Sequence, residues 1–408
     1  MRKLILFIIV MCATVASKGQ MLINGETLYG NEWIDYDKQY LKIALDETAI
    51  YKLTYDDLQN NGFPAQTTGS SLQLFNNGSQ VAIYTSNEGI LTPDDFILFY
   101  GKKNDGELDK FHFRTWERDQ LNPYANMYTD IRTYYLTWDE ASQNNARIVE
   151  IENDLSGSLP QKQNFYLHKE EQIHNNEHWG PKASVADIEY SSFVRTEGFG
   201  SGLKPIHTFE FDVTDIYDTA VKPRVDIRLG SNIAEHIIEF DVNGKILDTD
   251  VFNSLKVEDY SYSFDNSDLK GTTRLKLTGK GASDFFTVSY TALFYPRAFK
   301  ANNSDEFVFQ REGNSVNDYY EIEDFKVGTV NYAFDVENNT FLKPQVQGNK
   351  LRIHIPLGGA NRSDLFIIAQ RKLRQPLSMQ LKSFTSMDDV NPEYLILTTE
   401  VLNNSENG

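Results

Sequence analysis

The chain has 408 residues, a formal net charge of −19 and 13% aromatic residues. This length suffices for two or three domains with sizeable cores, and the aromatic content excludes a disordered acidic tail. A surface this negative repels phosphate backbones, so no nucleic-acid partner is predicted. No apolar stretch after the first twenty residues reaches membrane-spanning length, so we expect no transmembrane segment in the mature chain.

Residues 1–20 have the layout of a secretory signal peptide. Arg2 and Lys3 precede an apolar run from Leu4 to Val15, and small and polar residues follow. The run is too short to span a bilayer core of ~30 Å. We expect removal of residues 1–19 by a cut after Gly19, and export of the mature chain to the periplasm or the outer-membrane surface.

The only cysteine, Cys12, lies inside this peptide. Lipoprotein acylation there is disfavoured, because Met11 stands where a small residue normally precedes the modified cysteine. The mature chain is therefore expected to have no disulfide, no cysteine-ligated metal and no cysteine nucleophile.

Residues 20–155 are predicted to form an N-terminal β-rich domain. Runs of aromatic and β-branched residues with period-2 alternation predict short strands, and Asn-Gly, Pro-Asp and Asp-Gly pairs predict the turns between them. The predicted strands are Tyr51–Leu53, Leu72–Phe75, Phe96–Tyr100 and Thr133–Thr137. One short helix is predicted over Tyr55–Gln59, with Thr54 as its N-cap and two aspartates in its first turn.

Residues 156–387 are predicted to form a central β-sandwich of jelly-roll type, because many short antiparallel strands with few helices follow one another. A polar stretch, Asn153–Asn164, is the predicted linker. Ile238–Leu247 is predicted to be a hairpin, since Asn243-Gly244 supplies the two φ > 0 residues of a type I′ turn. The other predicted strands are Phe209–Val213, Val225–Leu229, Leu275–Leu277, Phe286–Tyr295, Tyr319–Ile322, Tyr332–Asp335, Lys350–Ile355 and Asp364–Ala369.

Residues 388–408 differ in kind, because Tyr394–Leu397 is an unbroken apolar run. Such a run is typical of a strand buried on both faces, as in a parallel α/β sheet. We interpret it as the start of a further, truncated domain. A last strand of the preceding sandwich is the alternative, since a parallel strand needs helices and neighbours that do not follow here.

His174 and His178 would share one face of a helix. The metalloprotease motif needs Glu directly after the first His, whereas Asn175 follows here. The Asn-rich surroundings and the following Trp179–Pro181 predict a solvated loop rather than a zinc site. The remaining histidines are expected to be mostly half-buried strand residues.

Two glycine-containing motifs also fail as chemical signatures. Gly200–Gly202 has Phe199 where a nucleophile elbow needs glycine, so a flexible turn is predicted. Gly279–Gly281 lacks the pattern of a phosphate loop, so a hairpin turn is predicted.

Three adjacent acid pairs, Asp56-Asp57, Asp94-Asp95 and Asp388-Asp389, lack the spacing of a calcium loop. A looser calcium site and a carboxylate pair for glycoside hydrolysis both stay open, because their spacing is a three-dimensional property. The tryptophans are expected mostly in cores, with stacking on sugars as the alternative. They are Trp33, Trp116, Trp138 and Trp179.

Eight segments follow one another in an order and spacing typical of one family. They are Tyr51–Leu58, Asp95–Gly101, Tyr134–Trp138, Glu177–Gly180, Tyr290–Arg297, Asp318–Ile322, Tyr332–Val336 and Glu393–Leu397. In this set the chain resembles the non-catalytic N-terminal region of the gingipain-like sortases (PorU-like) of the bacterial type IX secretion system. The resemblance covers nearly all of the mature chain, although each segment alone is weakly specific.

The resemblance implies that Tyr394–Leu397 matches the first strand of a caspase-like cysteine peptidase domain, whose catalytic His and Cys lie further downstream. No catalytic, cofactor-binding or metal-binding residue is therefore carried over to this chain, and no cofactor is implied. The family cleaves C-terminal sorting signals of exported cargo and attaches the cargo to surface lipopolysaccharide, together with an outer-membrane barrel partner.

Two hypotheses follow. The first is a scaffold region of a type IX sortase-like protein that lacks the catalytic domain and is inactive alone. The second is a secreted β-sandwich that binds carbohydrate through exposed Trp or Tyr residues. No motif supports a free-standing hydrolase.

Overall fold

The computed structural model describes residues 21–23, 26–28, 30–142, 144–181, 184–185, 188–189, 193–232, 234–312, 317–356 and 362–386. The predicted signal peptide with Cys12, the pair Asp388-Asp389 and the predicted truncated domain with Tyr394–Leu397 lie outside these residues. The described chain is mainly β, and almost all of its strands pair antiparallel, which confirms the predicted fold class. None of its helices is long and apolar enough to cross a membrane.

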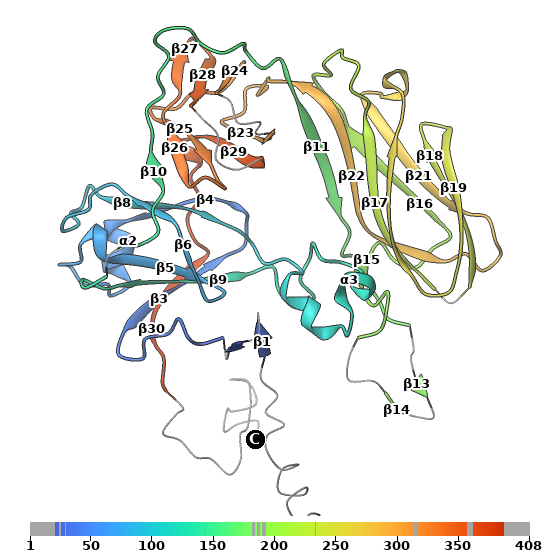
Figure 1. Ribbon diagram of the computed structural model, residues 1–408, viewed down its shortest axis with the longest axis horizontal. Coiled ribbons are helices and arrows are strands. Elements are labelled where there is room, and N and C mark those ends of the chain that lie inside the picture. The colour runs from blue at the N-terminus through green and yellow to red at the C-terminus, as the bar shows by residue number, and fades with distance from the viewer. Residues whose placement is uncertain are drawn as a thin grey trace, which may run out of the picture.

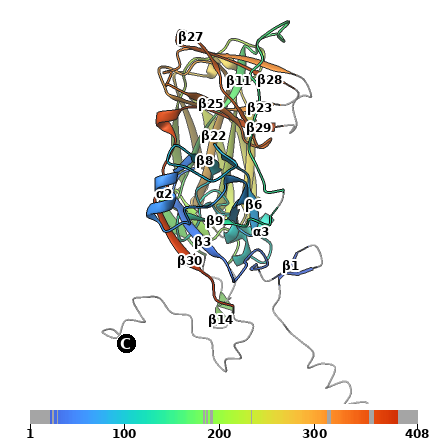
Figure 2. The ribbon, with the colours of Figure 1, turned by 90° about the vertical axis from the view of Figure 1, so that its left-hand side faces the viewer.

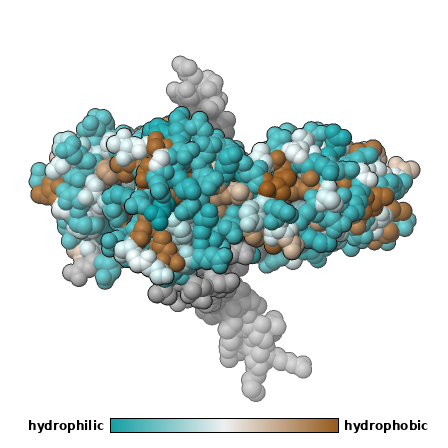
Figure 3. Space-filling model, turned by 90° about the horizontal axis from the view of Figure 1, so that it is seen from above, coloured by the Kyte–Doolittle hydropathy of each residue, from teal (hydrophilic) through white to brown (hydrophobic). Residues whose placement is uncertain are grey.

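The strands group into three lobes (Figure 1). The first lobe contains β3 to β9 and β30, the jelly-roll lobe contains β11 and β16 to β22, and the upper lobe contains β10 and β23 to β29. The view turned by 90° shows the upper lobe above the first lobe (Figure 2). Seen from above, polar side chains dominate the surface and apolar residues form small, separate patches (Figure 3).

The first lobe has two sheets, ordered β30-β3-β9-β5-β6 and β4-β8-β7. Its strands are β3 (Gln39–Leu45), β4 (Ala49–Thr54), β5 (Leu72–Asn76), β6 (Ser79–Val81), β7 (Ile83–Thr85), β8 (Phe96–Gly101), β9 (Arg132–Trp138) and β30 (Ser378–Ser383). The inward side chains of these sheets form one core; Leu41, Ile43 and Tyr51 are each at most 1% exposed. All four strands predicted in this region are confirmed.

Helix α2 (Tyr55–Asn60) begins where the sequence predicts. The side-chain oxygen Oγ1 of Thr54 accepts a hydrogen bond from the backbone N–H of Asp57 at 3.1 Å, and Asp57 Oδ2 accepts one from the N–H of Thr54 at 2.8 Å. This reciprocal capping box satisfies two N–H groups that the first turn leaves without partners. Asp57, one residue of the acid pair Asp56-Asp57, thus takes part in capping the helix.

Strand β30 returns to the first lobe after the chain has built the other two. It pairs with β3, from Gln39↔Ser383 to Ala44↔Ser378. Strand β10 (Val149–Glu150) leaves the first lobe and pairs with a strand of the upper lobe. The chain thus crosses between lobes at β10 and again before β30, and the predicted domain boundaries at 155/156 and 387/388 stay predictions.

The jelly-roll lobe consists of two four-stranded sheets, ordered β11-β22-β17-β20 and β16-β21-β18-β19. Its strands are β11 (Phe165–Ile173), β16 (Ile206–Asp212), β17 (Arg224–Ser231), β18 (Glu235–Val242), β19 (Lys245–Asn253), β20 (Val257–Ser263), β21 (Thr272–Gly279) and β22 (Phe286–Ala298). This interleaved order is that of a jelly roll, as predicted. Alternate residues such as Phe211, Leu229 and Phe240 fill the space between the sheets.

The predicted hairpin is confirmed, because β18 and β19 are joined at Asn243 (φ 52°) and Gly244 (φ 88°). Both residues have the positive φ that a type I′ turn requires.

Strand β22 connects the lobes at both of its ends. Its thirteen residues span about 43 Å at ~3.3 Å per residue. At the upper end Phe299 and Tyr166 enter the core of the upper lobe, with their ring centroids 5.1 Å apart. At the lower end Ser289 contacts the segment between β8 and β9. The jelly-roll lobe is thus held at two separated points.

The upper lobe has its own core and two sheets, ordered β10-β26-β25-β29-β23 and β24-β28-β27. Its strands are β23 (Glu306–Glu312), β24 (Asp318–Ile322), β25 (Asn331–Asp335), β26 (Thr340–Leu342), β27 (Gln345–Gln347), β28 (Lys350–Ile355) and β29 (Arg362–Ala369). Arg311, 1% exposed, donates to Asp318 at 2.6 Å and to Asp335 at 3.0 Å. Burial alone would lower the pKa of Arg311, but these carboxylates raise it, so the arginine stays charged inside the lobe.

The remaining described elements are short. They are β1 (Met21–Ile23), β2 (Glu26–Leu28), β12 (Glu177–Trp179), β13 (Ser184–Val185), β14 (Ile188–Glu189), β15 (Gly198–Gly200), α3 (Trp116–Asp119) and the 3₁₀ turns η1 (Gly69–Ser71), η2 (Leu108–His112), η3 (Asn266–Asp268) and η4 (Gln370–Lys372).

Candidate functional site

The segment between β8 and β9, residues 102–131, is here named the bridging segment. Both flanking strands belong to the first lobe, yet the segment leaves that lobe and packs against the lower end of the jelly-roll lobe, where Figure 1 shows α3. It contains only η2 and α3 as regular elements. Loops of this length without much regular structure are commonly functional.

Leu121 anchors the bridging segment on the jelly-roll lobe and is 0% exposed. A Cβ atom on Gly230 would lie 2.8 Å from Leu121 Cδ1, so the glycine makes room for the leucine. The carbonyl of Leu121 accepts hydrogen bonds from Ser289 Oγ at 2.8 Å and Arg228 Nε at 3.1 Å. The buried carbonyl of Leu121, which is not part of a sheet, therefore has the hydrogen-bond partners that a buried backbone group needs.

Polar side chains hold the rest of the segment in place. Asp109, 2% exposed, accepts hydrogen bonds from Asn126 Nδ2 at 2.7 Å and from the N–H of Met127 at 2.8 Å. Burial raises the pKa of Asp109. At the first-lobe end Arg132 donates to Asp105 at 2.9 Å. The segment is therefore ordered mainly by side chains that satisfy its backbone, rather than by a hydrophobic core of its own.

A groove forms where α3 faces the jelly-roll lobe, and we name it the arginine groove. Its lining residues are Arg114, Arg118, Asp119, Phe193, Val194, Arg195, Ser254 and Leu255. Asp119 accepts from Arg118 Nε at 2.7 Å and Nη2 at 2.8 Å, and from Arg195 Nε at 2.8 Å. These two guanidinium groups hold the pKa of Asp119 below its usual range. Arg118 and Arg195 share the single carboxylate of Asp119, so this part of the groove is cationic on a strongly anionic protein.

Two exposed aromatic rings belong to the same segment as the groove. Phe111 is 65% exposed and Trp116 is 44% exposed. Lys110 Nζ lies 5.2 Å from the centroid of the Phe111 ring and 5.7 Å from that of Trp116, so it contacts both as a cation–π partner. The bridging segment holds six of the seventeen large apolar side chains that are exposed in the described chain: Leu108, Phe111, Trp116, Tyr124, Tyr128 and Ile131. Such a concentration marks a candidate interaction surface.

A second groove, the tyrosine groove, lies on the outer face of β17, β20 and β22. Its lining residues are Tyr124, Asp226, Ile227, Arg228, Asp259, Tyr260, Ser261 and Tyr290. The ring of Tyr124 stacks on that of Tyr290, with centroids 4.2 Å apart and planes at 22°. Ser261 Oγ donates to Asp226 at 2.7 Å, and the carboxylates keep further acceptor capacity. An aromatic platform thus lies beside several polar groups.

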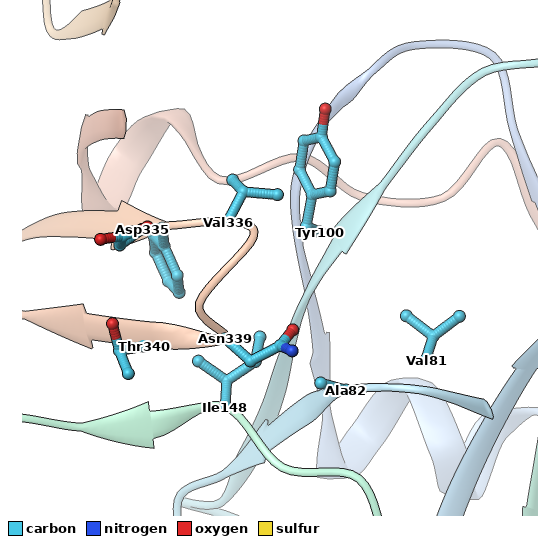
Figure 4. A pocket seen from close by; sticks show the side chains of 9 residues that line it. Val81, Ala82, Tyr100, Ile148, Asp335, Val336, Asn339 and Thr340 are labelled. Atoms are coloured by element: carbon cyan, nitrogen blue, oxygen red, sulfur yellow. The ribbon is translucent and has the colours of Figure 1, made fainter. Parts of the chain in front are cut away.

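A third cavity lies in the seam between the first lobe and the upper lobe (Figure 4). Its lining residues are Val81, Ala82, Tyr100, Ile148, Phe334, Asp335, Val336, Asn339 and Thr340. They are mostly apolar, and the carboxylate of Asp335 is already bound to Arg311 at 3.0 Å. The cavity continues the apolar core shared by the two lobes, so we interpret it as a packing feature.

The structure separates the two histidines that the sequence placed together. His174 is half-buried, with Nε2 3.1 Å from Thr291 Oγ1 and its ring 4.4 Å from that of Phe209. Burial lowers its pKa to about 4, so it is neutral at physiological pH. Residues 174–176 form a loop, as predicted, but His174 is not solvated, because it packs on the jelly-roll lobe. His178 is exposed on the short strand β12. Among the described residues, no group of three His, Cys, Asp or Glu side chains could hold a metal ion.

The motif at Gly200–Gly202 is an ordered connection and not the flexible turn predicted. Ser201 Oγ accepts from the N–H of Val288 at 3.0 Å and lies 3.0 Å from His207 Nδ1. His207 Nε2 lies 2.9 Å from the carbonyl of Phe286. A carbonyl only accepts, so Nε2 carries the proton and Nδ1 accepts from the serine hydroxyl. Burial lowers the pKa of His207, and neither residue lines the three cavities described above. The pair links strands and is not a nucleophile–base site.

The predicted hairpin at Gly279–Gly281 is also wrong, because β21 and β22 belong to different sheets. The turn crosses between the sheets and is fixed by Asp284, whose Oδ2 accepts from the N–H of Gly281 and from that of Ile237. A Cβ on Gly279 would lie 2.5 Å from Asp284 Cβ, which explains the glycine.

The acid pair Asp94-Asp95 caps a turn. Asp95 accepts from the N–H of Thr92 at 2.8 Å and from Ser86 Oγ at 2.9 Å. Burial alone would raise the pKa of Asp95, but these hydrogen bonds lower it.

Three of the four tryptophans pack against other residues. Trp33 contacts the rings of Tyr40, Phe75, Tyr135 and Phe384. Trp138 contacts Phe63, and Trp179 donates to Thr196 Oγ1 at 3.2 Å. Trp116 is the exception, since it stands exposed on the bridging segment.

No family model and no curated protein matches this chain. Among solved structures, latent dimeric PorU from Porphyromonas gingivalis aligns with a TM-score of 0.56 and 13% identity, over 84% of this chain and 33% of that chain. The two proteins share a fold over this region. The chain spans about a third of the PorU chain, so the activity of the whole PorU protein is not shown for it.

Two further structures align far more weakly. The protein BuGH86 in complex with neoagarooctaose has a TM-score of 0.19 and 11% identity, over 64% of this chain and 33% of that chain. A β-glucuronidase of Ruminococcus gnavus has a TM-score of 0.18 and 9% identity, over 53% of this chain and 43% of that chain. Neither likeness carries an argument about fold or function.

Proposed function

We propose that this chain is the N-terminal scaffold region of a type IX secretion sortase-like protein. The observation that carries the proposal is the fold shared with PorU over 84% of the chain. The ordered segments of the sequence support the same family independently of the fold comparison. In this role the region serves an enzyme that removes C-terminal sorting signals from exported cargo and attaches the cargo to the cell surface.

The scaffold role follows from what the described residues can do chemically. The only cysteine is Cys12, within the predicted signal peptide, so the chain supplies no thiol for a cysteine peptidase. The jelly-roll lobe is held at its upper end by Tyr166 and Phe299 and at its lower end by Leu121. One attachment joins it to the upper lobe and the other to a segment of the first lobe, so its orientation relative to both is fixed, which is what a positioning region requires.

The proposal also assigns a place and partners. The chain would be exported by its signal peptide and work in the periplasm or at the outer-membrane surface. There it would contact an outer-membrane barrel protein and the exported cargo.

Deletion of residues 30–386 in the bacterium that encodes the chain tests this role. Mass spectrometry of the C terminus of exported cargo is expected to find the sorting signal retained. Purified 20–408 alone is expected not to cleave such cargo. Normal cargo processing after the deletion, or cleavage by the purified chain, would contradict the scaffold proposal.

Carbohydrate binding at the tyrosine groove is the second candidate, favoured by the exposed ring of Tyr124 stacked on Tyr290 beside Asp226 and Asp259. A sugar ring could stack on Tyr124 while its hydroxyls donate to the carboxylates. On an array of neutral oligosaccharides, Tyr124→Ala is expected to lose binding. Tyr128→Ala is the control, since Tyr128 is 69% exposed on the same segment outside the groove. No binding to any glycan would exclude this candidate.

A further inference from the structure

The arginine groove is an exception to the electrostatics of the whole protein. The chain carries a net charge of −19, so its surface repels most anions. Two segments that are distant in sequence nevertheless bring Arg118 and Arg195 to one groove, and among the described lining residues Asp119 is the one carboxylate that faces them. The arginine groove therefore attracts anions locally, although the net charge of the protein repels them.

The guanidinium groups have more donors than Asp119 uses. A guanidinium carries five N–H donors, and Asp119 takes two from Arg118 and one from Arg195. Arg195 Nη1 donates in addition to the carbonyl of Leu255 at 3.3 Å. These bonds fix the planes of both groups, and fixed forks bind carboxylates with little loss of side-chain entropy.

The surroundings of the groove are apolar as well as basic. Phe193, Val194 and Leu255 line its wall, and the exposed rings of Phe111 and Trp116 belong to the same segment as α3. A small hydrated anion gains nothing from contact with these apolar side chains. A peptide that combines carboxylates with apolar side chains can use both features, because its apolar groups leave water when they pack against Phe193, Val194 and Leu255.

We propose that the arginine groove binds a carboxylate-bearing peptide segment of a partner protein, with Arg118 and Arg195 holding the carboxylate and the apolar wall holding a neighbouring side chain. Asp119 favours a singly charged carboxylate over a phosphate dianion, because its own charge reduces the attraction for a second negative charge. The proposal rests on the groove alone and stands or falls independently of the type IX assignment.

Fluorescence anisotropy with a short labelled peptide that alternates aspartate and leucine tests the proposal directly. The purified chain is expected to bind this peptide, and binding is expected to weaken as salt is raised. A peptide with asparagine in place of aspartate measures the contribution of the carboxylates. Equal affinity for the two peptides would overturn the proposal.

Arg118→Gln is the decisive variant, and it is expected to weaken binding of the aspartate peptide about tenfold, as the loss of a charge-assisted hydrogen bond does. Arg274→Gln is its matched control, because both side chains are 59% exposed and bonded to one carboxylate, Arg274 to Glu210 on the jelly-roll lobe. Because Arg118→Gln also removes two hydrogen bonds to Asp119, thermal unfolding of both variants is measured to check that each is folded at the temperature of the binding assay. If both variants lose the same affinity for the aspartate peptide, the effect comes from the net charge of the protein and not from the groove, and the proposal is overturned.

Two further outcomes identify a different occupant. Full displacement of the peptide by inorganic phosphate at equal concentration would make the groove a simple anion site and contradict the peptide assignment. Sedimentation that shows a dimer abolished by Arg118→Gln would assign the groove to a second copy of this chain, and would contradict it too.

Discussion

The jelly-roll lobe and the bridging segment touch each other but are stabilised in different ways. In the lobe, strict alternation buries residues such as Phe211, Leu229 and Phe240 between two sheets. The bridging segment buries only a few apolar side chains, Phe113, Leu121 and Ala125, and relies also on buried polar side chains such as Asp109 and Asp119. It leaves six large apolar side chains exposed. Apolar surface that does not stabilise the fold is available for a partner, so we place the interaction surface on the bridging segment.

The largest effect is expected in the jelly-roll lobe. Phe240 is 0% exposed in its core, so Phe240→Ala leaves a cavity and is expected to lower the free energy of unfolding by about 3–5 kcal/mol. Urea unfolding followed by circular dichroism measures the loss. A loss below about 1 kcal/mol would mean that the core does not stabilise the lobe as the alternation indicates.

Leu121→Ala tests the contact between the two regions. Leu121 fills the space that Gly230 leaves, and its truncation is expected to cost about 2–4 kcal/mol. The jelly-roll strands should stay folded, while limited proteolysis should cut the bridging segment sooner. Ile131→Ala is the control, because Ile131 is 40% exposed on the same segment. Unchanged proteolysis of Leu121→Ala would contradict the anchoring role.

A smaller, pH-dependent effect is expected at Asp119. Its pKa is lowered in the folded protein, first by the hydrogen bond from Arg118 and then by that from Arg195. Its contribution is therefore fully present above the unfolded carboxyl pKa of about 4 and is lost as pH falls through the lower folded value. Asp119→Asn is expected to cost about 1–2 kcal/mol at neutral pH, and less in acid. Thermal unfolding across this pH range measures it, with Asp212→Asn as control, since Asp212 is an exposed aspartate on β16. An acid dependence equal in wild type and Asp119→Asn would exclude this role.

The difference between the jelly-roll lobe and the bridging segment also explains which parts of the fold the sequence could predict. Period-2 alternation and the Asn243-Gly244 hairpin reveal the jelly-roll strands except β11 and β20, because both signals are local. The bridging segment has no period, and the bonds that order it join residues far apart, as Arg195 and Asp119 do. Strand β30 was missed because its sequence, SMQLKS, has few apolar residues and sits at a sheet edge.

The arginine groove and the exposed Trp116 could not be predicted from the sequence either. Exposed aromatics were considered for sugar binding, but the sequence did not distinguish Trp116 from the packed Trp33, since both lie among polar neighbours. The arginine groove was not predicted, because its residues come from segments near 118, 195 and 255 that only the fold brings together.

Site-specific photo-crosslinking in the bacterium that encodes the chain tests the central claim most directly. A photoreactive residue at Phe111, 65% exposed on the bridging segment, is compared with one at Ile246, 58% exposed on β19 of the jelly-roll lobe. We predict cross-links from position 111 to the type IX barrel protein or to exported cargo, and none from position 246. Cross-links to those proteins from position 246 alone would contradict the account.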